Sequence, residues 1–116
     1  MNGADKLNKQ LDDLWAKFLP EVRSRIETIQ RAIDALHNET LATDIRVAAI
    51  KAAHKLAGSL GTFGLENASA DALEIEQSLT DEPCASSNPA LLIQRLTRIR
   101  KAIDDRGRIA SSTARA

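Results

Sequence analysis

Apolar residues recur along this chain of 116 residues at steps of three and four, the spacing that gathers them on one face of an α-helix. No stretch of four or more residues alternates between apolar and polar, as a half-buried strand would. The pattern predicts an all-α chain. Its five helices are expected at about 7–19, 20–38, from between 39 and 44 to 60, from 67 or 69 to 79, and 89–105.

Each expected helix carries one apolar stripe that should face a common core. Most members are branched aliphatic residues or alanines, which suit helices that pack closely on one another. In chain order the stripes are Leu7, Leu11, Leu14, Trp15 and Phe18; Val22, Ile26, Ile29, Ile33 and Leu36; Ile45, Ala49, Ala52, Leu56 and Leu60; Ala68, Ala72, Ile75 and Leu79; and Leu92, Leu96, Ile99 and Ile103.

Proline and capping residues set the expected helix boundaries. Pro20 should end the first helix, because proline disfavours helical geometry in the residue before it, and should open the second. Either Asn67 or Ser69 can cap the fourth helix. Asn88 and Pro89 are expected to be the cap and first residue of the fifth.

Short connections between these helices favour antiparallel neighbours. The segment Gly61–Gly64 should break or tighten the third helix, and 81–89 is the clearest loop. We therefore expect an antiparallel up-and-down four-helix bundle over 20–105, with an additional N-terminal helix capping one end. Residues 106–116 lack an apolar face, so a single helical domain of residues 1–105 should be followed by a flexible tail or linker stub.

Composition narrows the class of protein. Sixteen basic and sixteen acidic residues give a net charge of zero, and aromatic residues make up only 3%, so nucleic-acid binding is not expected. No run approaches a membrane span and the N-terminus is charged rather than apolar, which predicts a cytoplasmic protein without membrane contact. The neutrality conceals an acidic fourth helix and a basic fifth helix, which can pair across the bundle.

Candidate chemistry is sparse. The lone Cys84 excludes an intramolecular disulfide, and no metal-binding spacing of cysteine or histidine is present, so we expect no metal site. His37 falls where a helix should end, and an imidazole near a helix C-terminus interacts favourably with the helix dipole. We therefore expect a structural role for His37.

His54 differs, because it does not belong to the apolar stripe of its own helix. At 100° per residue, Ala52 and Leu56 each lie about 160° away from it, so the imidazole should face outward. Gly58 lies one turn later, and a glycine inside a helix costs about 1 kcal/mol relative to alanine. Either a partner approaches closely there, or the glycine admits a neighbouring helix or belongs to the end of its own helix. The same side of the helix carries Val47, Ile50, Lys51, Gly58 and Gly61.

Charged residues surround this histidine. Lys51 and Lys55 can supply positive charge to a phosphoryl group, or can simply be solvated surface. If the third and fourth helices turn back near residue 65, Glu76 lies level with His54 and can accept a hydrogen bond from one ring nitrogen. A register shifted by one residue would place Gln77 there instead.

The run from Ala53 to Gly64 resembles the signature of histidine-containing phosphotransfer (HPt) domains of multistep phosphorelays. The matching residues are His54, Leu56, Gly58, Ser59, Phe63 and Gly64, whereas Ala57 stands where the family commonly has lysine. The resemblance is sharp over about a dozen residues, and the order of the helices extends it from about Trp15 to Ile103.

The resemblance implies a phosphocarrier without independent catalytic activity. His54 would accept a phosphoryl group on Nε2 from a receiver-domain phosphoaspartate, or from a sensor or hybrid histidine kinase, and pass it to a receiver aspartate. Mg²⁺ is expected only on the partner receiver. Residues near the phosphoryl group would be Lys51, Lys55, Gly58, Ser59 and Glu76, and residues that dock the partner would be Val47, Ile50, Gly58, Gly61 and Thr62.

Two other hypotheses remain. The bundle can be an interaction module that docks a receiver or another signalling protein without phosphorylation of His54. It can also be related to the dimerisation and phosphoacceptor domain of histidine kinases, although Lys55 follows His54 where that class has an acidic residue. Since the chain has enough helices to close a bundle alone, a monomer is expected.

Overall fold

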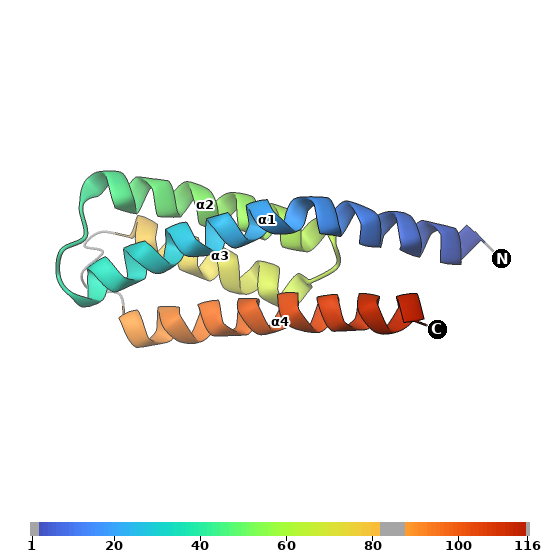
Figure 1. Cartoon of the computed structure of the whole chain (residues 1–116). Helices are drawn as coiled ribbons and strands as arrows, with labels where there is room; N and C mark the ends of the chain where they lie inside the picture. Colours follow the sequence, from blue (N-terminus) through green and yellow to red (C-terminus); the bar gives the residue numbers. More distant parts are fainter. Residues whose placement is uncertain (1–2, 82–87, 116) are drawn as a thin grey trace.

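Four helices and no strand make up the part of the chain that the computed structural model describes, which is residues 3–81 and 88–115 for the backbone. Side chains are described for 6–81 and 88–107. The helices are α1 (Gly3–His37), α2 (Thr43–Thr62), α3 (Glu66–Thr80) and α4 (Pro89–Arg115). They run alternately up and down side by side, and contacts of α1 with α2, α2 with α3, α3 with α4 and α4 with α1 close the bundle (Figure 1). The predicted all-α bundle is confirmed.

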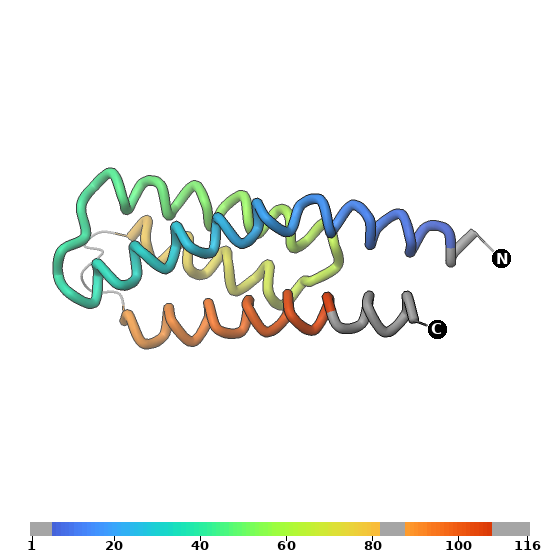
Figure 2. Tube along the Cα trace, viewed as in Figure 1, coloured from blue at the N-terminus to red at the C-terminus, as the bar shows by residue number. Residues whose placement is uncertain are grey.

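The predicted break at Pro20 is wrong, because α1 is one continuous helix that contains this proline. The separate N-terminal capping helix is therefore replaced by the first half of α1, which extends past the turn between α2 and α3 (Figure 2). Proline removes the hydrogen bond to the carbonyl four residues earlier, here that of Ala16. Pro20 and Ala16 are both exposed, so water can satisfy the freed carbonyl.

Other boundaries follow the capping rules unevenly. Asn88 caps α4 as predicted, since its Oδ1 accepts the N–H of Ala90 at 3.0 Å. The caps predicted for α3 are wrong: the N-cap is Leu65, and the hydroxyl of Ser69 instead donates to the carbonyl of Ala57 on α2 at 2.8 Å. The turn before α3 depends on Gly64, whose φ of 79° lies in the left-handed region.

α4 continues to Arg115, so helical geometry extends into the segment expected to be a tail. Arg106, the first residue of that segment, packs on the bundle: its guanidinium carbon lies 4.8 Å from the centroid of the Trp15 ring and 5.4 Å from that of Phe63. The same guanidinium pairs with Asp12 at 3.3 Å. The division of the chain at residue 105 otherwise stays a prediction, and the loop predicted at 81–89 lies largely outside the described residues.

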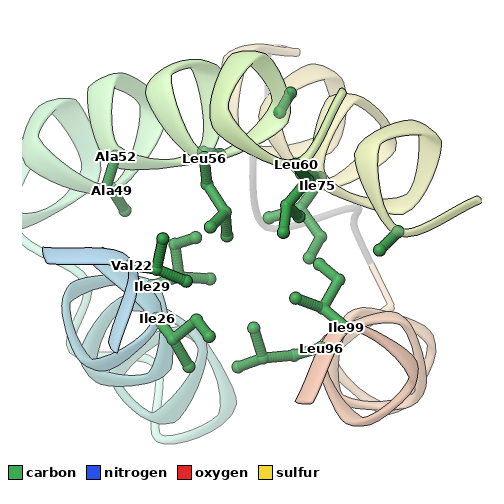
Figure 3. Packing of buried hydrophobic residues seen from close by; sticks show 14 of the residues in the cluster. Val22, Ile26, Ile29, Ala49, Ala52, Leu56, Leu60, Ile75, Leu96 and Ile99 are labelled. Carbon is green, nitrogen blue, oxygen red and sulfur yellow. The ribbon is translucent and has the colours of Figure 1, made fainter. Parts of the chain in front are cut away.

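The core contains most of the predicted stripe residues, and side chains from all four helices meet in it (Figure 3). Every predicted member from α3 and α4 is buried. The most exposed predicted members lie in the first half of α1 and the first turn of α2, and are 36–55% exposed. These are Leu7, Leu14, Phe18 and Ile45. Leu11 and Leu36 are partly buried.

The acidic and basic helices pair as expected. Asp71 of α3 is buried, and its Oδ1 lies 2.6 Å from Nη2 of Arg98 and 3.4 Å from Nη1 of Arg95 on α4. Arg46 of α2 donates to the last carbonyls of α3, those of Leu79 at 2.7 Å and Thr80 at 2.9 Å. These contacts fix α3 between α2 and α4.

Candidate functional site

His54 lies in the middle of α2, with its side chain 72% exposed. Its neighbour Ala53 and the next stripe residue, Leu56, are fully buried. The backbone at His54 is therefore held by the core while the imidazole faces outward, as the helical phase predicts.

Glu76 of α3 orients the imidazole. Nδ1 of His54 lies 3.1 Å from Oε1 and 3.3 Å from Oε2 of Glu76. When Nδ1 carries the proton it donates to this carboxylate, and Nε2 keeps its lone pair toward solvent. Gln77 is turned elsewhere, since its Nε2 donates to Asp81 at 2.7 Å. The alternative register is thus excluded.

Gly58 lies one turn after His54 and leaves open space. A Cβ built on it meets no heavy atom within 4 Å, so the glycine does not serve to admit a neighbouring helix. Gly61 differs, because a Cβ there would lie 3.5 Å from the Ser69 hydroxyl of α3. Of these two predicted docking positions, Gly58 borders free surface and Gly61 borders α3.

A hollow of about 500 Å³ opens beside Gly58, between α1 and α2. Its α2 side includes Ser59 and Thr62, whose hydroxyl donates to the carbonyl of Gly58 at 2.9 Å. Its full lining is Leu14, Phe18 and Arg25 from α1, Lys55, Gly58, Ser59 and Thr62 from α2, and Phe63 at the end of α2.

Sequence reasoning missed the α1 side of this hollow. Arg25 donates from Nη1 to the Ser59 hydroxyl at 2.9 Å, although 34 residues separate them. Phe18 and Phe63 stack edge to face, with centroids 6.2 Å apart. The apolar stripe predicted that Phe18 faces the core. The spacing of residues along the chain does not show which residues of α1 lie against the surface of α2.

The other predicted site residues lie on the exposed side of α2. Lys51 and Lys55 are exposed, and neither has an ion pair with a described residue. Val47, two turns before His54, is 42% exposed, and Ile50, one turn before it, is half-buried against the core; both lie on the side away from Gly58.

Three further expectations concern the rest of the chain. His37 lies in the last turn of α1, as predicted. The described residues contain no cluster of histidine, cysteine, aspartate and glutamate that can hold a metal ion. They also form no helix that is both long and apolar enough to cross a membrane. Cys84 lies outside them.

Comparison with known families gives one match. The family model described as Hpt domain matches residues 13–106, which is more than half of the chain. The comparisons with curated proteins and with solved structures gave no match. The matched range contains the bundle core, His54, Glu76 and Arg106. The chain therefore belongs to the family of Hpt domains, which transfer phosphoryl groups through histidine in phosphorelays and interact there with receiver domains and kinases.

Proposed function

We propose that His54 is the phosphorylated residue of a phosphocarrier that takes a phosphoryl group from a receiver-domain phosphoaspartate, or from a histidine kinase, and passes it to a receiver aspartate. The observation that carries this proposal is the pairing of Nδ1 with Glu76 at 3.1 Å on an imidazole that is otherwise exposed. His37 is exposed too, but no described carboxylate lies within bonding distance of it.

The transfer follows from this geometry. The lone pair of Nε2 attacks the phosphorus of the phosphoaspartate in line, a P–N bond forms, and the P–O bond to the aspartate breaks. The aspartate leaves as a carboxylate, and the proton on Nδ1 stays in its hydrogen bond to Glu76. The Glu76 carboxylate then stabilises the positive charge that develops on the ring. Transfer to an acceptor aspartate is the reverse.

Neighbouring residues support this step in different ways. Lys51 and Lys55 supply positive charge beside a phosphoryl group on His54. The open strip at Gly58 lets a partner backbone come close, and Val47, Ile50 and Thr62 extend the contact surface. Ser59 acts by holding Arg25, since its hydroxyl already accepts that guanidinium at 2.9 Å. Mg²⁺ belongs to the receiver, and the carrier works as a monomer without catalysis of its own.

Labelling of matched histidine variants tests the proposal. Purified receiver domains from the source organism, phosphorylated with acetyl phosphate, are offered to the wild type, to His54→Gln and to His37→Gln. We expect the wild type and His37→Gln to gain phosphate equally and His54→Gln to gain none, with all three circular-dichroism spectra helical. Label on His54→Gln would overturn the assignment. Equal binding of a receiver to wild type and His54→Gln, without any transfer, would instead establish the interaction module.

A further inference from the structure

The hollow between α1 and α2 combines an apolar end with a cationic end. Leu14 and Phe18 are 40% and 38% exposed, so both leave apolar surface uncovered. Arg25 and Lys55 border the same space, and its lining contains no acidic residue. The chain as a whole has no net charge, so this positive character is local.

Two hydrogen bonds hold the Arg25 guanidinium in place. Nη1 donates to Ser59 at 2.9 Å and Nη2 donates to Oε1 of Glu21 at 2.8 Å, which leaves the side chain only 17% exposed. A guanidinium fixed in this way loses little conformational entropy when it binds a carboxylate. Glu21 itself is 55% exposed, and an exposed pair one helical turn apart contributes only about 0.3–0.5 kcal/mol. An incoming carboxylate can therefore displace Glu21.

The hollow lies close to His54, so a protein that docks over His54 is the expected occupant. Gly58, on its border, lies one turn from His54, which is about 6 Å along α2. A specific interface covers about 800 Å² on each partner, and a round patch of that area has a radius of about 16 Å. Gly58 lies well within that radius, so a protein domain docked over His54 also reaches the Gly58 border of the hollow.

We infer that this hollow is a specificity pocket for the receiver domain, in which an apolar receiver side chain lies against Leu14, Phe18 and Phe63 while a neighbouring receiver carboxylate replaces Glu21 on Arg25. Lys55 adds a second positive charge to the same carboxylate. This inference rests on the proposed function and adds to it the residues that select the partner. Arg25 contacts the receiver and takes no part in bond making.

Single-turnover transfer kinetics test the pocket. The probe is the receiver domain that labels the wild type fastest in the test of the proposed function. It is phosphorylated and used in excess over the carrier, with its concentration varied. Arg25→Gln should raise the half-saturating receiver concentration about tenfold. The variant loses the charge-assisted hydrogen bond to the receiver carboxylate, and such bonds are stronger than neutral ones. Its rate at saturation should stay within twofold of wild type. Glu21→Gln should lower the half-saturating concentration about twofold, because Arg25 then has no competing partner.

Matched controls separate this role from a structural one. Arg23→Gln removes the same charge from the same helix, but Arg23 borders a different hollow, between α1 and α4, and should leave the kinetics unchanged. Phosphoramidate, a small phosphodonor that needs no docking, should label all four proteins at equal rates. If Arg25 only ties α1 to α2, neither Arg25→Gln nor Glu21→Gln will shift the half-saturating concentration, and the pocket is refuted.

Two other outcomes would also overturn it. If wild type accepts phosphate from neither phosphoramidate nor any receiver, the proposed function fails and the pocket fails with it. If wild type is labelled normally but sedimentation shows a dimer that Arg25→Gln dissociates, a second copy of this chain occupies the hollow. Glu21 is exposed, so Glu21→Gln should fold normally. Its predicted decrease in half-saturating receiver concentration therefore tests the pocket even if Arg25→Gln unfolds.

Discussion

Gly58 is the position where stability and transfer should respond in opposite directions. It lies inside α2, it does not have a positive φ, and a Cβ there meets no heavy atom within 4 Å. Replacing glycine by alanine in a helix interior gains about 0.8–1.0 kcal/mol, and no clash opposes that gain here. Gly58→Ala should therefore raise the free energy of unfolding by about 1 kcal/mol and Tm by about 4 °C.

The same position should be costly for transfer. Gly58→Gln keeps most of the gain in helix propensity but extends a side chain over the strip between His54 and the hollow. A receiver must push that side chain aside, so we expect transfer from a phosphorylated receiver to slow about tenfold, with a smaller effect for Gly58→Ala. Labelling by phosphoramidate should stay at the wild-type rate in both variants, because this donor is small.

Urea denaturation and receiver transfer kinetics measure the two effects, with Gly64 as the control. Gly64 has a φ of 79°, so Gly64→Ala should lower the free energy of unfolding by about 1–2 kcal/mol. Destabilisation of Gly58→Ala to the same extent would refute the claim of open space. Normal receiver transfer by Gly58→Gln would refute close approach at this strip.

Three other predictions concern the site and the core. Glu76→Ala removes the carboxylate that His54 Nδ1 contacts at 3.1 Å and should slow phosphoramidate labelling about threefold to tenfold, with Nδ1 protonation reduced in ¹⁵N NMR spectra; unchanged spectra and rate would contradict its orienting role. Asp71→Ala removes the partner of two arginines and should lower the free energy of unfolding by about 1–2 kcal/mol in urea titrations at low salt. Leu56→Ala, at a fully buried position, should cost about 2–5 kcal/mol, whereas Leu73→Ala, at a 49% exposed one, should change the midpoint little.

Helical phase predicted the core well, because it depends on local geometry alone. The stripes of α3 and α4 are buried at every predicted position. The predicted helix break at Pro20 was wrong because it relied only on the tendency of proline to disfavour helical geometry in the residue before it. Trp15, Val22 and Ile26 are buried on the same face of α1, at steps of seven and four, so the apolar phase continues across the proline. That continuity indicated one helix, because a break would have reset the phase.

The site was only half predictable, for a geometric reason. His54 and Glu76 are brought level by the turn between α2 and α3, so counting residues back from that turn relates them. Arg25 and Ser59 have no such link, since α1 and α2 are joined at the opposite end of the bundle from this contact. How α1 is rotated against α2 depends on packing of the whole core, which residue spacing does not encode.

A phosphocarrier needs a site that is rigid in its backbone and open at its reacting atom, and the bundle meets both needs with few residues. The neighbours Ala53 and Leu56 are fully buried, so the core fixes the backbone position of His54 and the direction in which its side chain projects. A single carboxylate then orients the ring through Nδ1 and leaves Nε2, the nitrogen proposed to react, toward solvent. If the His54 imidazole were more deeply buried, protein charges would act on the phosphoryl group more strongly. Such a buried site would also favour the complex with one partner over the complex with the other. In the proposed function, donor and acceptor receivers must both reach Nε2, so the charges that complete the transfer are best supplied by each partner in turn. A carrier of this kind can then discriminate between partners outside the reacting centre, and we propose that Arg25, in the hollow beside Gly58, does so here.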